Sequence, residues 1–161
     1  MLNERLTWLG VPPSRSLPCT WDPPFANPIR SPLVFTIADL DVVHDRLGTP
    51  ATLPDYLREL NALGVARSDS FLSDGHSEYL SEDGYKVVGA ATHEALVVAG
   101  AARPDQLREH LERHSRGETS YLEMSKGLAA SGIAKWTFDT MRMTISYCDV
   151  AGKEVLVEEI R

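Results

Sequence analysis

Apolar residues follow two different periods along the chain after residue 34. In some segments they recur every three or four positions, as on one face of an amphipathic helix, and in others they alternate with polar residues, as in a half-buried strand. The helical period predicts helices near residues 36–47, 53–63, 104–116 and 119–131. The alternation predicts strands near residues 68–73, 76–80, 85–88, 133–139, 143–148 and 155–158, and a further short strand near 95–98. Two helices and a three-stranded meander, occurring twice, predict an α+β fold whose helices cover an antiparallel sheet.

Local signals predict where these elements begin and end. Thr36 and Asp39 are spaced nearly as in a helix-capping box, and Gly64 stands where a helix would end in the left-handed conformation. Asp74-Gly75 is a common tight hairpin turn. The faces predicted to point into the core consist of Ile37, Leu40, His44 and Leu47 on the first helix and of Tyr121, Met124 and Leu128 on the last.

The chain also aligns with a shifted copy of itself. A single shift, without a gap, places Leu60–Arg67 on Leu128–Lys135 and Tyr79 on Tyr147. Self-similarity at a fixed spacing is the signature of a repeated structural unit. We therefore predict an internal duplication of a helix-helix-meander unit. The two predicted units cover residues of about 35–100 and 101–161, and Gly64 and Gly132 mark their equivalent helix ends.

The segment 1–34 differs in composition from the rest of the chain. Seven of the ten prolines lie there, together with Trp8 and Trp21, and no apolar period is visible. Because proline fixes the backbone angle φ, this segment is predicted to be an N-terminal arm outside a single domain of residues 35–161. A second interpretation is a start codon assigned too far upstream, since Val34 stands where a GUG codon could initiate translation.

Composition and charge narrow the classes of partner. The chain has 161 residues, 43% of them hydrophobic and 24% charged, with a formal net charge of −7, which suits one domain with its own core. Residues 36–88 carry ten Asp or Glu against four Arg or Lys, an imbalance that argues against nucleic acid as a partner. No apolar stretch is long enough for a membrane span. Since only Cys19 and Cys148 occur, we expect neither a disulfide framework nor a metal cluster, and a cytoplasmic location.

Several short motifs carry a resemblance to a known family. They are Phe35-Thr36-Ile37, Asp74-Gly75-His76, Gly117-Glu118-Thr119-Ser120-Tyr121 and Gly132-Ile133-Ala134-Lys135-Trp136. From Phe35 to Arg161 the chain resembles the YbcV/YdfO-like family, a bacterial and prophage domain of unknown function that is sometimes labelled a phage envelope protein. The resemblance implies an α+β domain and brings no established activity or catalytic residues. Two positions differ: Val34 stands where family members begin with Met, and Cys148 where the family pattern has an aromatic residue.

Histidine and aspartate supply the candidates for chemistry. Asp74 and His76 are candidate catalytic residues, because an imidazole beside a carboxylate can act as a general base or bind a metal. The structural alternative is that Asp74 only forms the hairpin turn. His44, His76 and His114 are the candidate metal ligands. His44 and His114 fall on predicted apolar helix faces, however, where packing in a core or an interface explains a histidine better than metal binding does.

Aromatic residues supply the candidates for ligand binding, namely Tyr79, Trp136 and Tyr147, although aromatic residues that alternate along strands also suit a core. Glu158 and Glu159 are interpreted as a charged strand edge that prevents unwanted pairing. No phosphate-binding loop or nucleophile elbow is present. We therefore predict a non-enzymatic binding or regulatory module without a cofactor, with a homodimer as one candidate assembly. The alternative is a metal- or His-dependent enzyme that uses His44, His76, His114 and Asp74.

Overall fold

The computed structural model describes residues 34–161, so the predicted N-terminal arm lies outside the described residues. Four helices form where the helical period predicts them: α1 (Ile37–Leu47), α2 (Leu53–Leu63), α3 (Pro104–Ser115) and α4 (Tyr121–Ala130), with a short 3₁₀ turn, η1 (Pro50–Thr52), before α2. The six strands are β1 (Arg67–Phe71), β2 (Ser77–Leu80), β3 (Lys86–Gly89), β4 (Ile133–Asp139), β5 (Thr144–Asp149) and β6 (Glu154–Glu159).

The predicted strand near residues 95–98 is wrong. Residues 90–103 connect β3 to α3 without helix or strand. Single backbone hydrogen bonds hold this connection instead, from the Leu96 amide to the Ser73 carbonyl and from the Ala99 amide to the Ala129 carbonyl. Because these acceptors belong to a hairpin turn and a helix end, they offer no neighbouring strand with which residues 95–98 could form a ladder.

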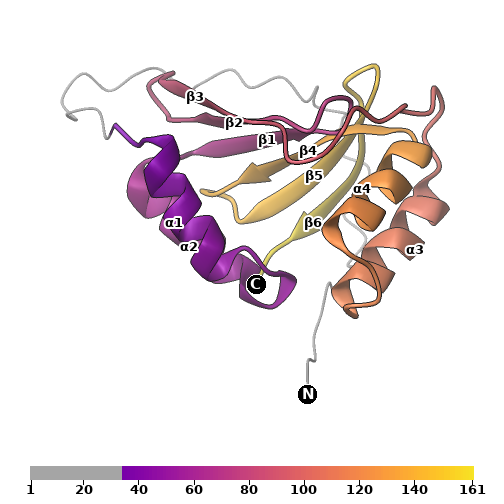
Figure 1. The fold of residues 1–161 in the computed structure, drawn as a ribbon, viewed down its shortest axis with the longest axis horizontal. Coiled ribbons are helices and arrows are strands. Elements are labelled where there is room, and N and C mark those ends of the chain that lie inside the picture. The colour runs from indigo at the N-terminus through magenta and orange to yellow at the C-terminus, as the bar shows by residue number, and fades with distance from the viewer. Residues whose placement is uncertain (1–33) are drawn as a thin grey trace.

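The six strands form one antiparallel sheet with the order β3-β2-β1-β4-β5-β6. Each half of the domain contributes a meander, and the meanders join at the centre, where Asp69 of β1 lies opposite Thr137 of β4 (Figure 1). The α+β class predicted from the sequence is confirmed. The same order of elements occurs in both halves, but the internal duplication itself stays a prediction.

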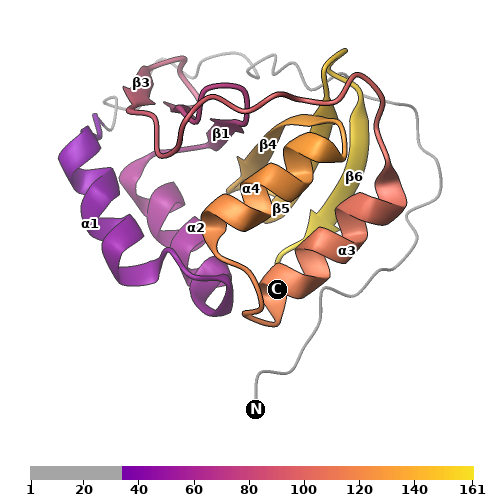
Figure 2. The same cartoon turned by 45° about the vertical axis from the view of Figure 1, so that its right-hand side comes forward.

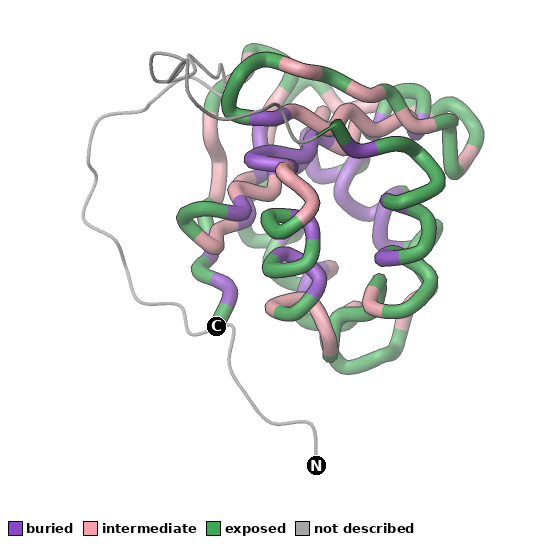
Figure 3. Tube along the Cα trace, turned by 90° about the vertical axis from the view of Figure 1, so that its left-hand side faces the viewer, coloured by how far each residue is buried: buried purple, intermediate pink, exposed green. Residues whose placement is uncertain are grey.

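Both helix pairs lie on the same face of the sheet. Figures 1 and 2 show α1 and α2 beside the β3-β2-β1 half and α3 and α4 beside the β4-β5-β6 half. Within the described residues, the opposite face carries no helix. Figure 3 shows the buried positions gathered where helices and sheet meet. The fully buried aliphatic side chains of the core include Leu57, Leu60, Leu107, Leu128 and Ile133, and burial stabilises each by about 1.5–3 kcal/mol.

Helix α1 buries a different face from the predicted one. Leu40 and Val43 are buried, whereas His44 is exposed and Ile37 is about one-third exposed. The buried stripe follows Leu40, Val43 and Leu47, which also fits the spacing of one helical face and keeps the polar imidazole near solvent. The prediction that His44 points into the core is therefore wrong. On α4, Met124 and Leu128 are buried as predicted, but Tyr121 is 41% exposed.

The predicted helix boundaries are confirmed where local chemistry sets them. The Thr36 amide donates to the Asp39 carboxylate at 2.8 Å, and the Thr36 hydroxyl accepts from the Asp39 amide, which completes the capping box of α1. Gly64 ends α2 with φ = 99°, in the left-handed region that glycine adopts without a steric penalty. Ser120 and Glu123 form a second capping box at α4.

The bonding state of the Cys148 side chain was not predicted from the sequence. The residue lies fully buried on β5 and is disulfide-bonded. The sequence predicted no disulfide framework, and two cysteines that are far apart in the chain give no spacing pattern from which a single pairing can be recognised.

Candidate functional site

Three tyrosines converge on the helix-covered face of the sheet, and we call Tyr56, Tyr79 and Tyr121 the tyrosine cluster. Tyr56 lies on the buried face of α2, one residue before Leu57. Tyr79 is at the second-to-last position of β2, where the strand alternation turns its ring toward the helices. Tyr121 is the first residue of α4, directly after its cap. The cluster thus joins a helix from each half of the domain to a strand of the first meander.

The three phenol groups lie close to one another. The Tyr56 and Tyr79 hydroxyls are near enough for each to shift the pKa of the other, and Tyr121 influences the ionisation of both. Burial is the main cause that raises the pKa of each of the three hydroxyls above its ordinary value. The hydroxyls therefore stay neutral at physiological pH, and each can both donate and accept a hydrogen bond.

Aromatic edges and further hydroxyls surround the tyrosine cluster. The Trp136 ring meets Tyr121 edge-on with centroids 5.9 Å apart, and Phe138 meets Tyr56 in the same way at 6.2 Å. The hydroxyls of Ser77 and Thr92 lie near enough to Tyr79 and Tyr121, respectively, to lower the pKa of each phenol in part. One carboxylate, Asp41 of α1, also lies near enough to raise the pKa of Tyr79.

The structure brings two of the three predicted ligand-binding residues together. Tyr79 belongs to the tyrosine cluster, and Trp136 contacts it through Tyr121. Tyr147 lies apart on β5, where it is 4% exposed and its hydroxyl faces Glu158. Whether any of the three binds a ligand stays a prediction. Tyr56 was not among the predicted residues, because its place in the apolar period of α2 resembles that of an ordinary core residue.

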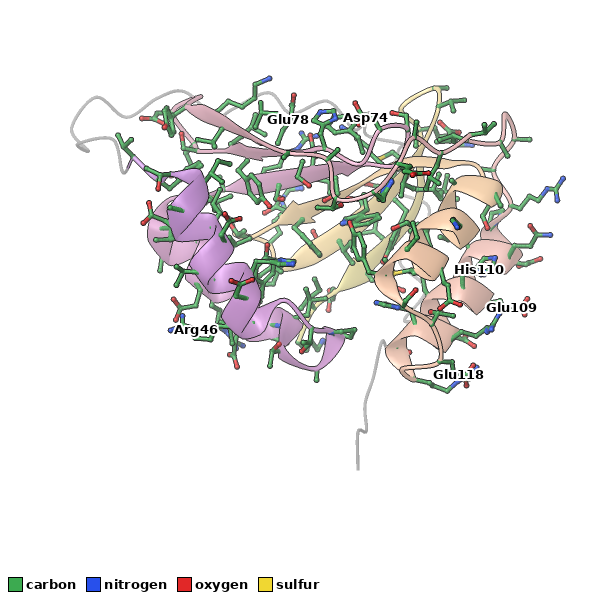
Figure 4. The ribbon with its side chains drawn as sticks, in the orientation of Figure 1. Arg46, Asp74, Glu78, Glu109, His110 and Glu118 are labelled. Carbon is green, nitrogen blue, oxygen red and sulfur yellow. The ribbon has the colours of Figure 1, made fainter. Side chains whose placement is uncertain are left out.

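The predicted pair Asp74 and His76 does form. The Asp74 carboxylate lies 2.5 Å from Nδ1 of His76 and also accepts from the His76 amide at 3.2 Å. The hydrogen bond to the His76 ring is the largest cause that lowers the pKa of Asp74. The imidazole stacks on Phe71 with centroids 4.4 Å apart, and its Nε2 lies 3.8 Å from Glu78. In Figure 4, Asp74 and Glu78 lie on the side of the sheet away from the helices. The Asp74-His76 pair is therefore separate from the tyrosine cluster.

The candidate metal ligands are not gathered into one site. The His44 ring lies edge-on to Tyr56 at 5.9 Å, beside the tyrosine cluster. On α3, Nδ1 of His114 lies 3.0 Å from the Thr119 carbonyl oxygen, where it closes the turn after the helix. Among residues 34–161, no group of three or more His, Cys, Asp or Glu side chains is arranged to hold a metal ion. The set of His44, His76, His114 and Asp74 therefore has no common centre.

Sequence reasoning missed Glu158. The residue is only 8% exposed and faces Tyr147 under the second helix pair. Burial raises the pKa of its carboxyl to about 7. Strand β6 does lie at the edge of the sheet, as the interpretation of Glu158 and Glu159 as a charged strand edge requires. That interpretation is wrong for Glu158, however, because the alternation along β6 turns Glu158 inward and Val157 and Glu159 outward. The valines at 155 and 157 favour the opposite face of this strand as the buried one, so the sequence pattern does not indicate that Glu158 points inward.

Fold and site define an α+β domain in which a cluster of tyrosines joins one helix of each pair to the sheet. Residues 42–159 match the family described as "Protein of unknown function (DUF1398)", and the chain belongs to this family. No curated protein matches the chain. Within the described residues, every helix is too short or too polar to cross a lipid bilayer. The narrower resemblance to YbcV/YdfO-like proteins and the prophage origin stay predictions.

Proposed function

We propose that this protein is a non-enzymatic binding module and that the tyrosine cluster binds a small, uncharged, planar ligand. The observation that carries the proposal is the convergence of three neutral phenol groups from α2, β2 and α4. Side chains from both halves of the domain meet there, so a ligand would contact both. Ligand sites commonly combine aromatic side chains with a few polar groups that fix orientation.

The chemistry of the cluster favours an uncharged ligand. Phenol and alcohol hydroxyls donate and accept hydrogen bonds without carrying charge, and the edges and faces of Tyr121 and Trp136 suit a planar ring. Asp41, which lies near Tyr79, would repel a carboxylate or a phosphate. Free nucleobases and uncharged nucleosides have both the planar ring and the hydrogen-bonding edge that this arrangement complements.

Tryptophan fluorescence can test the proposal, because Trp136 touches the tyrosine cluster. In a Trp8→Phe, Trp21→Phe background, Trp136 is the only tryptophan of the chain. Titration with adenine, uracil and their nucleosides should change its emission with a saturable dependence on concentration. Tyr79→Phe, which removes one hydroxyl and keeps the ring, should weaken binding by about tenfold, the effect of one lost hydrogen bond.

Tyr85→Phe is the matched control for the Tyr79 substitution. Tyr85 is a half-buried tyrosine of the same sheet half, and its hydroxyl donates to the Phe35 carbonyl oxygen outside the cluster. The Tyr85 variant should bind as the unsubstituted background does. Equal loss in both variants, or no saturable change with any of the compounds, would contradict the proposed function.

A second function is favoured by one contact, the 2.5 Å approach of Asp74 to His76. In a His-dependent enzyme, Asp74 would orient the imidazole and His76 would move a proton. The other ring nitrogen, Nε2, points toward Glu78 at 3.8 Å, so a substrate would have to enter beside that carboxylate. A hydrolase or isomerase screen with the wild type and His76→Gln tests this alternative. The wild type should show an activity that the variant lacks, and an activity that survives in the variant would contradict it. Thermal shift with Zn²⁺ tests the metal-dependent form.

A further inference from the structure

Glu158 holds the one buried side-chain nitrogen or oxygen atom in residues 34–161 that the fold leaves without a hydrogen bond. Its Oε1 atom is enclosed and finds no partner among these residues. A buried carboxylate oxygen in this condition is costly when the group carries its charge, because water has been removed and nothing replaces it. The cost disappears when the carboxyl is protonated or when water reaches it.

Three elements place groups around this carboxyl. Glu158 lies on β6 opposite Ile145 of β5, and the Tyr147 hydroxyl faces it from two residues further along β5. The positive charge of Arg108 on α3 lies near enough to lower the pKa of the Glu158 carboxyl. Burial raises the pKa of Glu158 to about 7, and Arg108 and the Tyr147 hydroxyl act in the opposite direction. The proton therefore leaves near neutral pH.

We propose that Glu158 is a proton-operated latch that sets how closely α3 packs against the outer strands β5 and β6. The protonated carboxyl is neutral and remains enclosed beside Tyr147. After the proton leaves, the carboxylate needs water at Oε1, and water reaches it when α3 moves away from the sheet.

The latch acts on α3 and α4 together. A Cβ atom placed on Gly127 of α4 would lie only 2.5 Å from Nδ1 of His110, so the imidazole of α3 rests directly on the α4 backbone. Figure 4 shows His110 and Glu109 on α3, the helix that the latch would release. Since α4 begins with Tyr121, loosening of this helix pair would also alter the wall of the tyrosine cluster.

Amide hydrogen exchange of the full-length protein, corrected for intrinsic rates, tests the latch. The ordinary pKa of 4.5 and the folded value of about 7 differ by about 2.5 pH units, which limits the change in an opening equilibrium to about 300-fold. Between pH 5.5 and 8.5, the protection of α3 amides should fall by tenfold or more, with a midpoint near pH 7. Glu158→Gln, which is neutral at every pH, should remove this dependence. The adjacent Glu159→Gln should keep it, because Glu159 is exposed.

Tyr147→Phe provides a second test that does not depend on the folding of the Glu158 variant. The phenol hydroxyl lowers the pKa of Glu158, so its removal should move the midpoint of the α3 transition to higher pH. Protection that does not change with pH in the wild type would overturn the proposal. An unchanged transition in Glu158→Gln, or a Tyr147→Phe midpoint that stays or moves to lower pH, would do the same.

Discussion

Replacement of Asp69 by Asn should destabilise the protein more than any other single change of a carboxylate to an amide on the helix-free face. Asp69 lies at the centre of the sheet with a side chain only 7% exposed. The Arg67 guanidinium donates to both carboxylate oxygens, through Nε at 2.9 Å and Nη2 at 2.8 Å. The Thr137 hydroxyl donates at 2.6 Å, and Lys135 lies 3.4 Å away. The carboxylate thus ties β1 to β4, the strands that join the two meanders.

Asp69→Asn should lower the free energy of unfolding by about 3–5 kcal/mol, the usual cost of removing one partner of a buried ion pair. Asn keeps the shape of the side chain but presents an amide nitrogen, which cannot accept the hydrogen bonds that Arg67 donates. The guanidinium side chain, 9% exposed, then stays buried without its bidentate acceptor. The bond from Thr137 accounts for about 1.5–3 kcal/mol of interaction with a charged acceptor, so Thr137→Val should cost less than Asp69→Asn.

Urea unfolding at pH 7 measures this loss directly. With a slope of about 2 kcal/mol per molar urea, the midpoint should fall by roughly 2 M. Asp55→Asn is the matched control, because Asp55 also pairs with an arginine, Arg58 at 2.7 Å, but the two side chains are 65% and 62% exposed. That variant should lose less than about 1 kcal/mol. Equal losses in the two variants would refute the assignment of a buried ionic centre at Asp69.

Three further changes test other parts of the structure. Gly127→Ala should destabilise by about 1–3 kcal/mol, because the new Cβ would overlap the His110 ring, and His110→Ala in the same chain should recover most of the loss in urea unfolding. Gly64→Ala should cost about 1–2 kcal/mol at φ = 99°, whereas Gly100→Ala, which meets no atom within 4 Å, should be nearly neutral in thermal unfolding. For Glu158, the folded pKa of about 7 exceeds the ordinary value of 4.5, so the folded state binds the proton more tightly. The free energy of unfolding should therefore fall by about 2.5 kcal/mol as pH rises from 5 to 8, and Glu158→Gln should abolish that slope.

Elements with local causes could be predicted from the sequence. The capping box of Thr36 and Asp39 and the left-handed Gly64 need only residues within one helical turn, and both are confirmed. The Asp74-His76 contact is equally local, since both residues belong to one hairpin turn. The face of α1 could not be fixed in this way, because two registers of apolar residues fit the helical period and only tertiary packing chooses between them.

The contacts that could not be predicted join residues that are far apart in the sequence, through strand pairing or helix packing. Asp69 meets Thr137 from the other half of the chain, and no local pattern indicates that β1 and β4 pair. The burial of Glu158 depends on Arg108 and its helix lying over the outer strands. The metal hypothesis had the same weakness, since His44 and His114 lie on helices of different pairs.

The two central strands, β1 and β4, carry different side chains on the helix-covered face of the sheet. In the self-alignment that places Gly64 on Gly132, Ser68 and Ser70 of β1 correspond to Trp136 and Phe138 of β4. In the sheet, Ser68 lies opposite Phe138 and Ser70 opposite Trp136. Small hydroxyl side chains on one central strand therefore face large aromatic rings on the other, although the backbone arrangement of the two strands is similar.

This difference limits the tyrosine cluster to one location. Tyr79 is paired with Ser68, whose small side chain leaves the phenol free to meet Tyr56. In the same self-alignment its counterpart is Tyr147, which is paired with Trp136 and is almost fully enclosed. The second half thus has no room for an equivalent cluster, and its phenol meets a buried carboxyl instead. Isothermal titration with a ligand of the cluster should accordingly give one binding site per chain, and a stoichiometry of two would contradict this account.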